Sequence, residues 1–188
     1  ADGIIGQMME KVVLPPFRPR RTEEEIRKQM PWATQGKLAG HKRNVITSLE
    51  LDPAIMEENN IRFQAKYRKI EEAEVRYEEI GCENADYLMI AFGSMARICL
   101  KTQEMALAEG IKVGVLRPIT LWPFPSKIIA EYANKVKGMI SVELNAGQMV
   151  EDIRLAVNGK VKVEHFGRLG GIVPTPDEVL NALKQKLM

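Results

Sequence analysis

Short apolar runs alternate with segments of helical periodicity along the second half of the chain. Each run is nearly uninterrupted, which is typical of strands that are buried on both faces of a parallel sheet. Repeated strand–helix units of this kind predict a sheet covered by helices on both sides, with right-handed crossovers. The pattern therefore predicts a three-layer α/β/α domain over residues 85–188. Its predicted strands span residues 87–92, 112–116, 139–143 and 161–166.

Polar residues after these runs mark the starts of the helices. Ser94 and Ser126 follow the first two predicted strands and are predicted to cap the next helices. Thr175-Pro176-Asp177-Glu178 combines a capping box with proline at the first helical position, which is a strong start signal for the last helix.

Residues 44–84 give a weaker pattern. Val45 to Leu51 alternates like a short strand, and Asp52 followed by Pro53 predicts the start of a helix. That helix carries an apolar stripe, which predicts a packing face. A second alternating stretch near residues 75–80 predicts an edge strand, so 44–84 is predicted to be a connecting segment.

Residues 1–43, called the arm below, show no sustained periodicity. Its prolines favour an extended backbone, and Thr22 to Glu25 predicts a short capped helix before Pro31. The arm also carries Phe17 and Trp32. A charged linker is one interpretation, but two exposed aromatic residues favour an arm that wraps a neighbouring subunit.

Composition and charge restrict the class of protein. Hydrophobic residues make up 45% and charged residues 28%, which is ordinary for a globular domain. The arm carries nine basic against five acidic residues, and 44–84 carries five against ten, so a contact within or between subunits is favoured over nucleic-acid binding. No membrane span or signal peptide is predicted. Only two cysteines are present, which favours a cytoplasmic protein.

The stiff segment 117–125, called the proline loop below, follows a predicted strand and contains three prolines. In open α/β sheets the carboxyl ends of the strands form the ligand-binding edge. We expect the strand ends near Ser94, Arg117 and Glu143 to lie along that edge. The candidate anion or interface contacts are Ser94, Arg117, Thr120, Trp122, Phe124, Glu143, Asn145, Gln148 and Arg168.

The chemistry of these residues leaves alternatives open. Arg117 is suited to clamping a carboxylate or phosphate and equally to pairing with Glu143. Gly93 lacks the further glycines of a dinucleotide fingerprint. His165 either acts as a base or is structural, and Cys99 is predicted to be an inert core thiol. The spacing of histidines and cysteines predicts no metal or cluster site, and no catalytic residue is assigned.

Several longer segments are more specific than the short motifs above. They are Ile5 to Glu10, Pro31 to Thr34, Glu74 to Glu78, the proline loop, Glu143 to Asp152 and Gly167 to Gly171. Together these segments resemble the C-terminal part of the α subunit of 2-oxoacid:ferredoxin oxidoreductases. The resemblance covers nearly the whole chain and is closest to the enzymes for branched-chain 2-oxoacids such as 3-methyl-2-oxobutanoate (2-ketoisovalerate). The 2-oxoglutarate-type enzyme is the alternative.

The resemblance implies a transketolase C-terminal-domain fold with a five-stranded, mostly parallel sheet. The one antiparallel strand is expected near Glu74 to Ile80. The complete enzyme converts a 2-oxoacid, coenzyme A and oxidised ferredoxin to acyl-CoA, CO₂ and reduced ferredoxin in anaerobic metabolism. It uses thiamine diphosphate, Mg²⁺ and iron–sulfur clusters, and the implied partners are β, γ and ferredoxin-like δ subunits and ferredoxin.

The resemblance also implies that this chain begins inside the preceding pyrimidine-binding domain. We therefore expect it to hold no cofactor itself and to be inactive as an isolated fragment. Two other classes remain open. One is a stand-alone anion- or nucleotide-binding module that uses Gly93-Ser94 and Arg117. The other is a purely structural interaction domain, which the arm and the acidic segment 44–84 favour.

Overall fold

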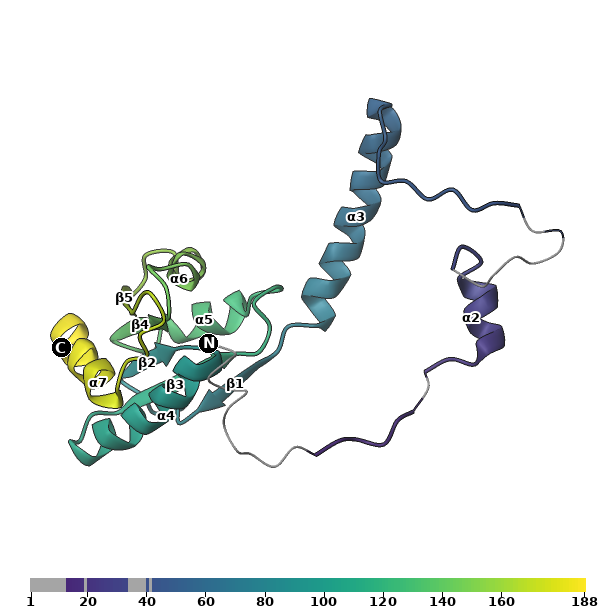
Figure 1. Cartoon of the computed structure of the whole chain (residues 1–188). Helices are drawn as coiled ribbons and strands as arrows, with labels where there is room; N and C mark the ends of the chain where they lie inside the picture. The colour runs from purple at the N-terminus through teal and green to yellow at the C-terminus, as the bar shows by residue number, and fades with distance from the viewer. Residues whose placement is uncertain (1–12, 19, 34–39, 41) are drawn as a thin grey trace. The chain divides into compact units, whose positions relative to one another are not determined.

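The computed structural model describes residues 13–18, 20–33, 40 and 42–188 of the chain (Figure 1). Two compact units are distinguished. One contains Lys66–Met188, and the other lies within Met9–Ala65. The boundaries at residues 43 and 84 stay predictions.

A five-stranded sheet forms the centre of the larger unit. Its strand order is β1-β3-β2-β4-β5, in which β1 runs antiparallel to β3 and every other neighbouring pair is parallel. The fold class and the single antiparallel strand are therefore confirmed. The strands are β1 (Tyr77–Ile80), β2 (Tyr87–Ile90), β3 (Val113–Pro118), β4 (Gly138–Glu143) and β5 (Lys162–Gly167).

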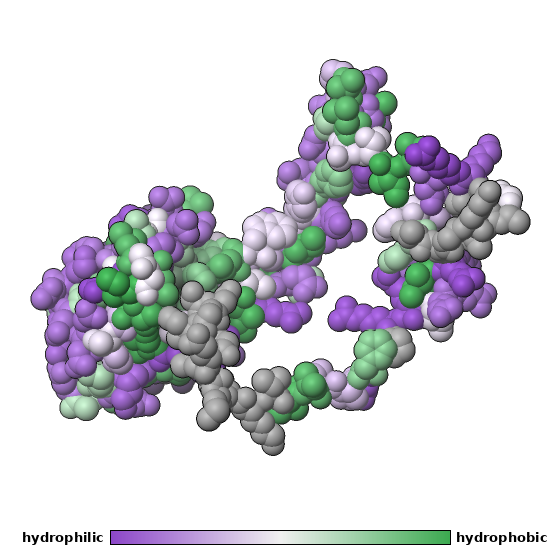
Figure 2. Space-filling view, in the orientation of Figure 1, coloured by the Kyte–Doolittle hydropathy of each residue, from purple (hydrophilic) through white to green (hydrophobic). Residues whose placement is uncertain are grey.

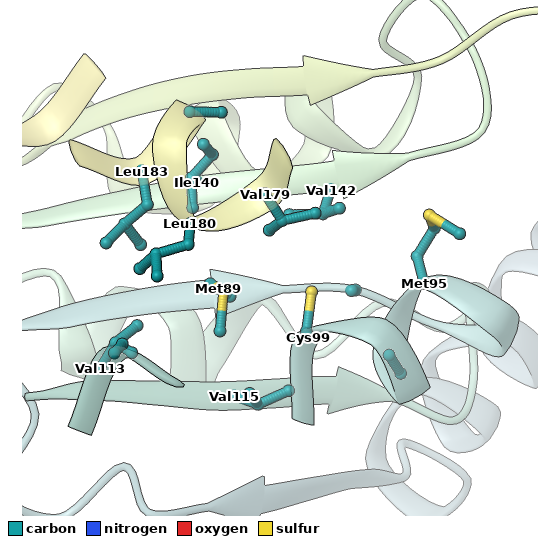
Figure 3. Close-up of a cluster of buried hydrophobic side chains, with 14 residues drawn as sticks. Met89, Met95, Cys99, Val113, Val115, Ile140, Val142, Val179, Leu180 and Leu183 are labelled. Atoms are coloured by element: carbon teal, nitrogen blue, oxygen red, sulfur yellow. The ribbon is translucent and has the colours of Figure 1, made fainter. Parts of the chain in front are cut away.

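Helices cover both faces of this sheet and enclose two apolar clusters. Alternate residues of each buried strand point to opposite faces, so Met89 belongs to one cluster while Leu88 and Ile90 belong to the other. Figure 3 shows the first cluster, in which Leu180 and Leu183 of the last helix lie over Met89 and Ile140. The covering helices are α4 (Gly93–Ala108) and α7 (Pro176–Leu187) on that face, and α5 (Ser126–Tyr132) and α6 (Met149–Val157) on the other.

Two capping boxes stand at the starts of helices. The capping box of α7 is confirmed: Glu178 N donates to Thr175 Oγ1 at 3.3 Å, and Thr175 N donates to Glu178 Oε2 at 2.8 Å. The same motif at Thr22 and Glu25 begins α2 (Glu23–Gln29). The sequence motif suffices at both sites because a capping box joins groups only three residues apart.

The prediction that Ser94 and Ser126 cap their helices is wrong. The N-cap residues are Phe92 and Pro125, and neither helix has a side-chain cap. Gly93 adopts a positive φ of 57°, and the N-cap of α4 lies two residues before Ser94. The N-cap of α5 lies one residue before Ser126. Both serines therefore lie in the first helical turn.

The smaller unit contains α2 and the first part of α3 (Pro53–Ala73). Asp52 Oδ1 accepts a hydrogen bond from Ala54 N at 2.8 Å, which confirms the predicted start of α3. The strand predicted over 45–51 is wrong, since these residues have no regular secondary structure. An alternating segment forms a strand only when it finds a partner strand, and local periodicity does not supply one.

None of the residues of α3 is buried, although Tyr67 on its apolar stripe contacts the ring of Trp122. Figure 2 shows hydrophobic residues along α3 and along the extended segment 13–18 of the arm. The packing face predicted for α3 is therefore exposed in the single chain. None of the described helices combines the length and apolar character needed to cross a membrane.

Candidate functional site

The three predicted strand ends meet at one edge of the sheet. β2, β3 and β4 run parallel, and their register places Ile90 beside both Leu116 and Ser141. The residues that follow, including Arg117 and Glu143, therefore lie along the same edge, as the topology requires. Their side chains nevertheless have separate surroundings and separate partners.

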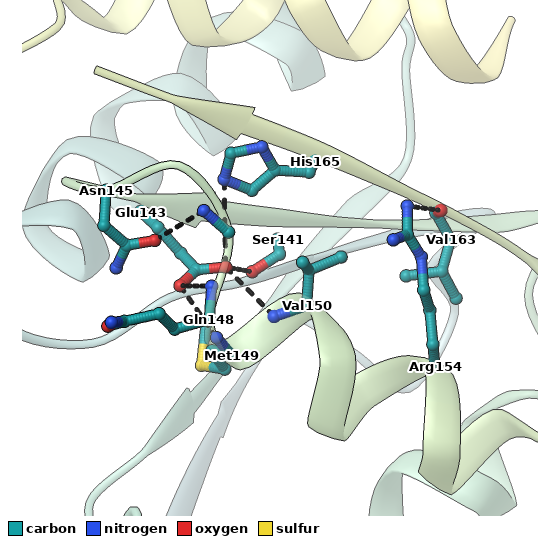
Figure 4. Close-up of polar contacts among 10 residues, drawn as sticks. Ser141, Glu143, Asn145, Gln148, Met149, Val150, Arg154, Val163 and His165 are labelled. Carbon is teal, nitrogen blue, oxygen red and sulfur yellow. Dashed lines mark hydrogen bonds and ion pairs between the residues drawn. The ribbon is translucent and has the colours of Figure 1, made fainter. Parts of the chain in front are cut away.

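Glu143, at the end of β4, is a buried carboxylate with only 2% of its surface exposed. Its Oε1 accepts hydrogen bonds from Ser141 Oγ at 2.7 Å and from Val150 N at 3.0 Å. Its Oε2 accepts from Met149 N at 2.9 Å and from Gln148 N at 3.1 Å (Figure 4). The carboxylate thus satisfies the backbone donors at the start of α6, where a negative charge also interacts favourably with the helix dipole.

The surroundings of Glu143 keep it ionised. Burial on its own would raise the pKa, but the Ser141 hydroxyl, the N–H groups of Met149 and Gln148, and the Asn145 side chain outweigh burial and lower the pKa of Glu143 below its ordinary value. A carboxylate that accepts four hydrogen bonds from its own chain is a structural anchor. It is poorly suited to accepting a proton in catalysis, because a general base needs a raised pKa and access to its substrate.

Asn145 and His165 lie beside this anchor. Asn145 Oδ1 accepts a hydrogen bond from Gly147 N at 2.7 Å and so holds the turn between β4 and α6. His165 Nε2 lies 3.9 Å from Glu143 Oε1, which is too long for a hydrogen bond, and this buried nitrogen finds no partner within the described residues. The geometry supports a packing role for His165 more than a role as a base.

Arg117 pairs with Glu78, and the predicted alternative of a pair with Glu143 is wrong. Arg117 Nη1 lies 2.7 Å from Glu78 Oε2, and the two residues are directly opposite on β3 and β1. Their side chains are 42% and 49% exposed, so this ion pair contributes little to stability. The pair of Arg117 and Glu78 could not be predicted from the sequence, because the register of the antiparallel edge strand is not determined by neighbouring residues.

Thr120 fixes the proline loop to the residue that precedes β1. Its Oγ1 accepts a hydrogen bond from Arg76 N at 3.0 Å and donates one to Pro123 O at 2.9 Å. Arg76 O in turn accepts from the backbone N of Ile119 and Thr120. The peptide bond between Trp122 and Pro123 is cis. These contacts give the loop one defined shape.

The two aromatic residues of the proline loop are placed differently. Phe124 is partly buried against the cluster beneath α5 and α6. Trp122 is 56% exposed, and its ring makes a T-shaped contact with the ring of Tyr67, with centroids 5.6 Å apart and planes at 85°. Trp122 and Phe124 both line a cleft of about 770 Å³, called the aromatic groove below. Its other lining residues are Glu71, Glu72, Val75, Tyr77, Pro123, Pro125, Ser126, Lys127, Ile128 and Glu131.

The remaining candidates lie apart from this groove. Ser94 is buried in the first turn of α4. Arg168 Nη1 pairs with Glu178 Oε1 at 3.0 Å and ties the loop after β5 to α7. Asn145 and Gln148 line a small cavity of about 150 Å³ beside Glu143 and Phe124. Among the residues that the structure describes, no three His, Cys, Asp or Glu side chains gather as metal ligands.

The nine candidates therefore divide among several places and do not form one pocket. Sequence reasoning missed Ser141, which supplies a hydroxyl to Glu143, and Tyr132, whose hydroxyl donates to Glu79 and joins α5 to β1. A signal for Ser141 was present: it is polar within a buried strand and lies two residues before Glu143, on the same face. No local signal pointed to Tyr132 and Glu79.

Comparisons with solved structures agree with this fold. The 2-oxoglutarate:ferredoxin oxidoreductase from Magnetococcus marinus, solved with 2-oxoglutarate, coenzyme A and succinyl-CoA bound, superposes with a TM-score of 0.64 and 26% identity, covering 74% of this chain and 24% of that chain. A split-gene transketolase, an inactive β4 tetramer, gives a TM-score of 0.52 and 20% identity over 60% of this chain and 41% of that chain, and supports the fold alone.

Sequence comparisons give the family. The ketoisovalerate oxidoreductase subunit VorB of Methanothermobacter thermautotrophicus is 43% identical over 184 residues, which cover 98% of this chain and 50% of the relative. The chain thus spans about half the length of this curated relative. Residues 85–179, which include β2 to β5 and the proline loop, match the family model of the pyruvate:ferredoxin oxidoreductase core domain II. Because that match covers half of the chain, the protein belongs to the pyruvate:ferredoxin oxidoreductase core domain II family.

Proposed function

We propose that the chain is the C-terminal assembly domain of the α subunit of a 2-oxoacid:ferredoxin oxidoreductase of the ketoisovalerate type. The complete enzyme would convert 3-methyl-2-oxobutanoate, coenzyme A and oxidised ferredoxin to the acyl-CoA, CO₂ and reduced ferredoxin. The 43% identity to a ketoisovalerate oxidoreductase subunit supports this substrate class. The domain's own task would be to hold the other subunits in place around the active site.

One observation carries the assembly role. The charged groups at the ligand-binding edge have partners in their own chain, because Glu143 accepts four hydrogen bonds and Arg117 pairs with Glu78. Large aromatic side chains, in contrast, remain exposed to solvent in the single chain: Trp122 is 56% exposed and Phe17 is 91% exposed. Exposed aromatic residues at preformed surfaces are typical anchors of protein–protein interfaces.

The cofactors belong to the complete enzyme in this proposal. The described residues offer no ligand set for Mg²⁺ or an iron–sulfur cluster. Thiamine diphosphate, Mg²⁺, iron–sulfur clusters and coenzyme A would be bound by the remaining part of the α subunit and by β, γ and ferredoxin-like δ subunits. Ferredoxin would be the electron acceptor, and the whole assembly would be cytoplasmic.

Reconstitution tests the proposal. The chain alone should give no 2-oxoacid-dependent reduction of a viologen dye. Co-expressed with the other subunits and the preceding part of α, it should co-purify with them, and the complex should reduce ferredoxin in the presence of coenzyme A and 3-methyl-2-oxobutanoate. Turnover by the chain alone would contradict the assembly role. A complex that lacks this chain and keeps full activity would also contradict it.

Two alternatives give different results in the same experiments. The similarity to the Magnetococcus marinus enzyme supports a 2-oxoglutarate-type complex as the second candidate. A kcat/KM at least tenfold higher for 2-oxoglutarate than for 3-methyl-2-oxobutanoate would favour that candidate. A stand-alone anion-binding module should bind nucleotides or thiamine diphosphate in calorimetric titrations of the isolated chain. We expect no binding, because Glu143 already places a carboxylate at the start of α6.

A further inference from the structure

The aromatic groove and the arm have complementary chemistry. The arm reads Leu14-Pro15-Pro16-Phe17-Arg18-Pro19-Arg20-Arg21, and its described part from 13 to 18 has no regular secondary structure. A chain with this proline content favours the polyproline II conformation. Such a helix repeats every three residues, so Val13 and Pro16 would lie on one face. Proteins bind segments of this kind in grooves lined by aromatic side chains.

The groove has the composition that such recognition requires. Trp122, Phe124 and Tyr77 line it, together with prolines of the proline loop. Trp122 is exposed and its indole carries one N–H donor, which suits a carbonyl oxygen of a ligand backbone that makes no internal hydrogen bonds. Because Thr120 ties the proline loop to Arg76, the groove is preformed and loses little entropy on binding.

The charges along the aromatic groove favour one orientation of a bound segment. Glu71, Glu72 and Glu131 are exposed on its lining, against the single basic residue Lys127. The arm carries the opposite charge immediately after its Pro-rich stretch, at Arg18, Arg20 and Arg21. Arginines that follow a polyproline segment would therefore meet acidic residues beside the aromatic surface. Such complementarity determines the orientation and the rate of association.

We propose that the aromatic groove of one copy of this chain binds residues 14–21 of the arm of a second copy. This proposal does not rest on the function proposed above. A second copy fits the amount of exposed apolar surface, which exceeds what one groove can cover: Leu14 and Phe17 of the arm and Ile55, Met56 and Ile61 of α3 are all exposed. A two-fold pair that exchanges arms would bury each arm in a groove and use the same contact twice.

Sedimentation equilibrium of the full chain tests the exchange. The wild-type chain should form a dimer, and Phe17→Ala and Trp122→Ala should each weaken the dimer at least tenfold. Leu155→Ala, an exposed apolar residue of α6 outside the groove, is the matched control and should leave the dimer unchanged. The circular dichroism spectra of all variants should match the wild type, which separates lost association from lost folding.

Mixing two variants of the chain shows which segment occupies the aromatic groove. Phe17→Ala keeps an intact groove and Trp122→Ala keeps an intact arm, so an equal mixture should form heterodimers with one working contact. Charge reversal of Glu71 and Glu131 to lysine should weaken the dimer at least tenfold, and combining it with Arg18→Glu and Arg20→Glu should restore most of the affinity. A synthetic peptide of residues 13–21 should shift the fluorescence of Trp122 in a Trp32→Phe chain and dissociate the dimer.

Each other result overturns the proposal. A chain that stays monomeric at every concentration has no second copy in its groove. A monomer whose Trp122 fluorescence still responds to the peptide uses the groove for its own arm or for another partner. A dimer that is insensitive to both alanine variants is held together elsewhere. None of these results affects the reconstitution of oxidoreductase activity, so failure here is distinct from failure of the proposed function.

Discussion

Glu143→Gln keeps the shape of the buried side chain and removes its charge. The substitution replaces one carboxylate oxygen by an NH₂ group, which donates hydrogen bonds and accepts none. If the amide nitrogen takes the place of Oε2, the N–H groups of Gln148 and Met149 lose their acceptor. If it takes the place of Oε1, Val150 N and the Ser141 hydroxyl lose theirs.

The expected loss follows from this geometry. A buried donor left without an acceptor costs about 1–3 kcal/mol. Either orientation of the amide strands two donors, of which the Gln148 N–H is only partly buried. The Ser141 hydroxyl is able to rotate towards another acceptor, so the orientation that strands this hydroxyl costs less. We therefore expect Glu143→Gln to lower the free energy of unfolding by about 2–4 kcal/mol at neutral pH. Urea unfolding followed by circular dichroism measures this loss.

The pH dependence gives an independent test of the same cause. The pKa of Glu143 in the folded protein is lowered, so as the pH falls the unfolded state takes up the proton first. The stabilisation is fully present above the unfolded pKa of about 4.3 and is lost as the pH falls through the folded value. The difference between wild type and Glu143→Gln should therefore shrink in acid.

Glu151→Gln is the matched control for this prediction. Glu151 lies in the first turn of the same helix but is exposed. Removing the charge of Glu151 should lower the free energy of unfolding by no more than about 1 kcal/mol, because an exposed carboxylate in this position interacts mainly with the helix dipole. Equal effects of the two substitutions would refute the role given to the buried hydrogen bonds. A loss at Glu143 that is the same at pH 7 and in acid would refute the role given to its charge.

Four further predictions concern other parts of the chain. Cys82 and Cys99 should resist alkylation at pH 8 until urea unfolds the domain, because burial raises the pKa of Cys82 to about 11 and also raises the pKa of Cys99. Gly114→Ala should lower the free energy of unfolding by about 1–3 kcal/mol, since a Cβ there would lie 2.8 Å from Cys82 Cα. Trp122→Ala should change the urea midpoint of the monomer far less than a core substitution, because Trp122 is 56% exposed. Limited proteolysis should remove the arm before it cuts within 85–188, and early cuts inside that range would contradict the predicted boundary.

The elements of the sheet domain were predictable because their signals are local. Buried parallel strands appear in the sequence as continuous apolar runs. The capping box at Thr175 involves residues that are three apart in the sequence. The end of α6 also has a local signal, because Asn158, which has a left-handed φ of 49°, is followed by glycine. The two capping boxes, which join groups close in sequence, were confirmed. The single-residue cap signals at Ser94 and Ser126 were wrong, because one polar residue does not determine where the helix begins. The failure at residues 45–51 follows the same rule, because a strand also needs a partner from elsewhere in the chain.

The arrangement of the site was less predictable because it depends on register. The common edge of Arg117 and Glu143 followed from parallel topology alone. The partner of Arg117 did not, since Glu78 comes opposite it only through the antiparallel register of β1 and β3. The four donors to Glu143 lie within seven residues of it, yet recognising them required knowing that the carboxylate is buried and turns towards the start of α6.

The position that most α/β folds reserve for a ligand is occupied here by the protein itself. The carboxyl ends of β2, β3 and β4 form the usual binding edge, and the start of α6 is its natural anion site. Glu143 fills that site with a carboxylate from the same chain, and its lowered pKa keeps the charge in place. A domain whose anion site is internally satisfied has lost its simplest route to binding a phosphate or carboxylate substrate. The exposed surface that remains is the aromatic groove beside the proline loop, which supports the proposed role of the domain in contacts between chains.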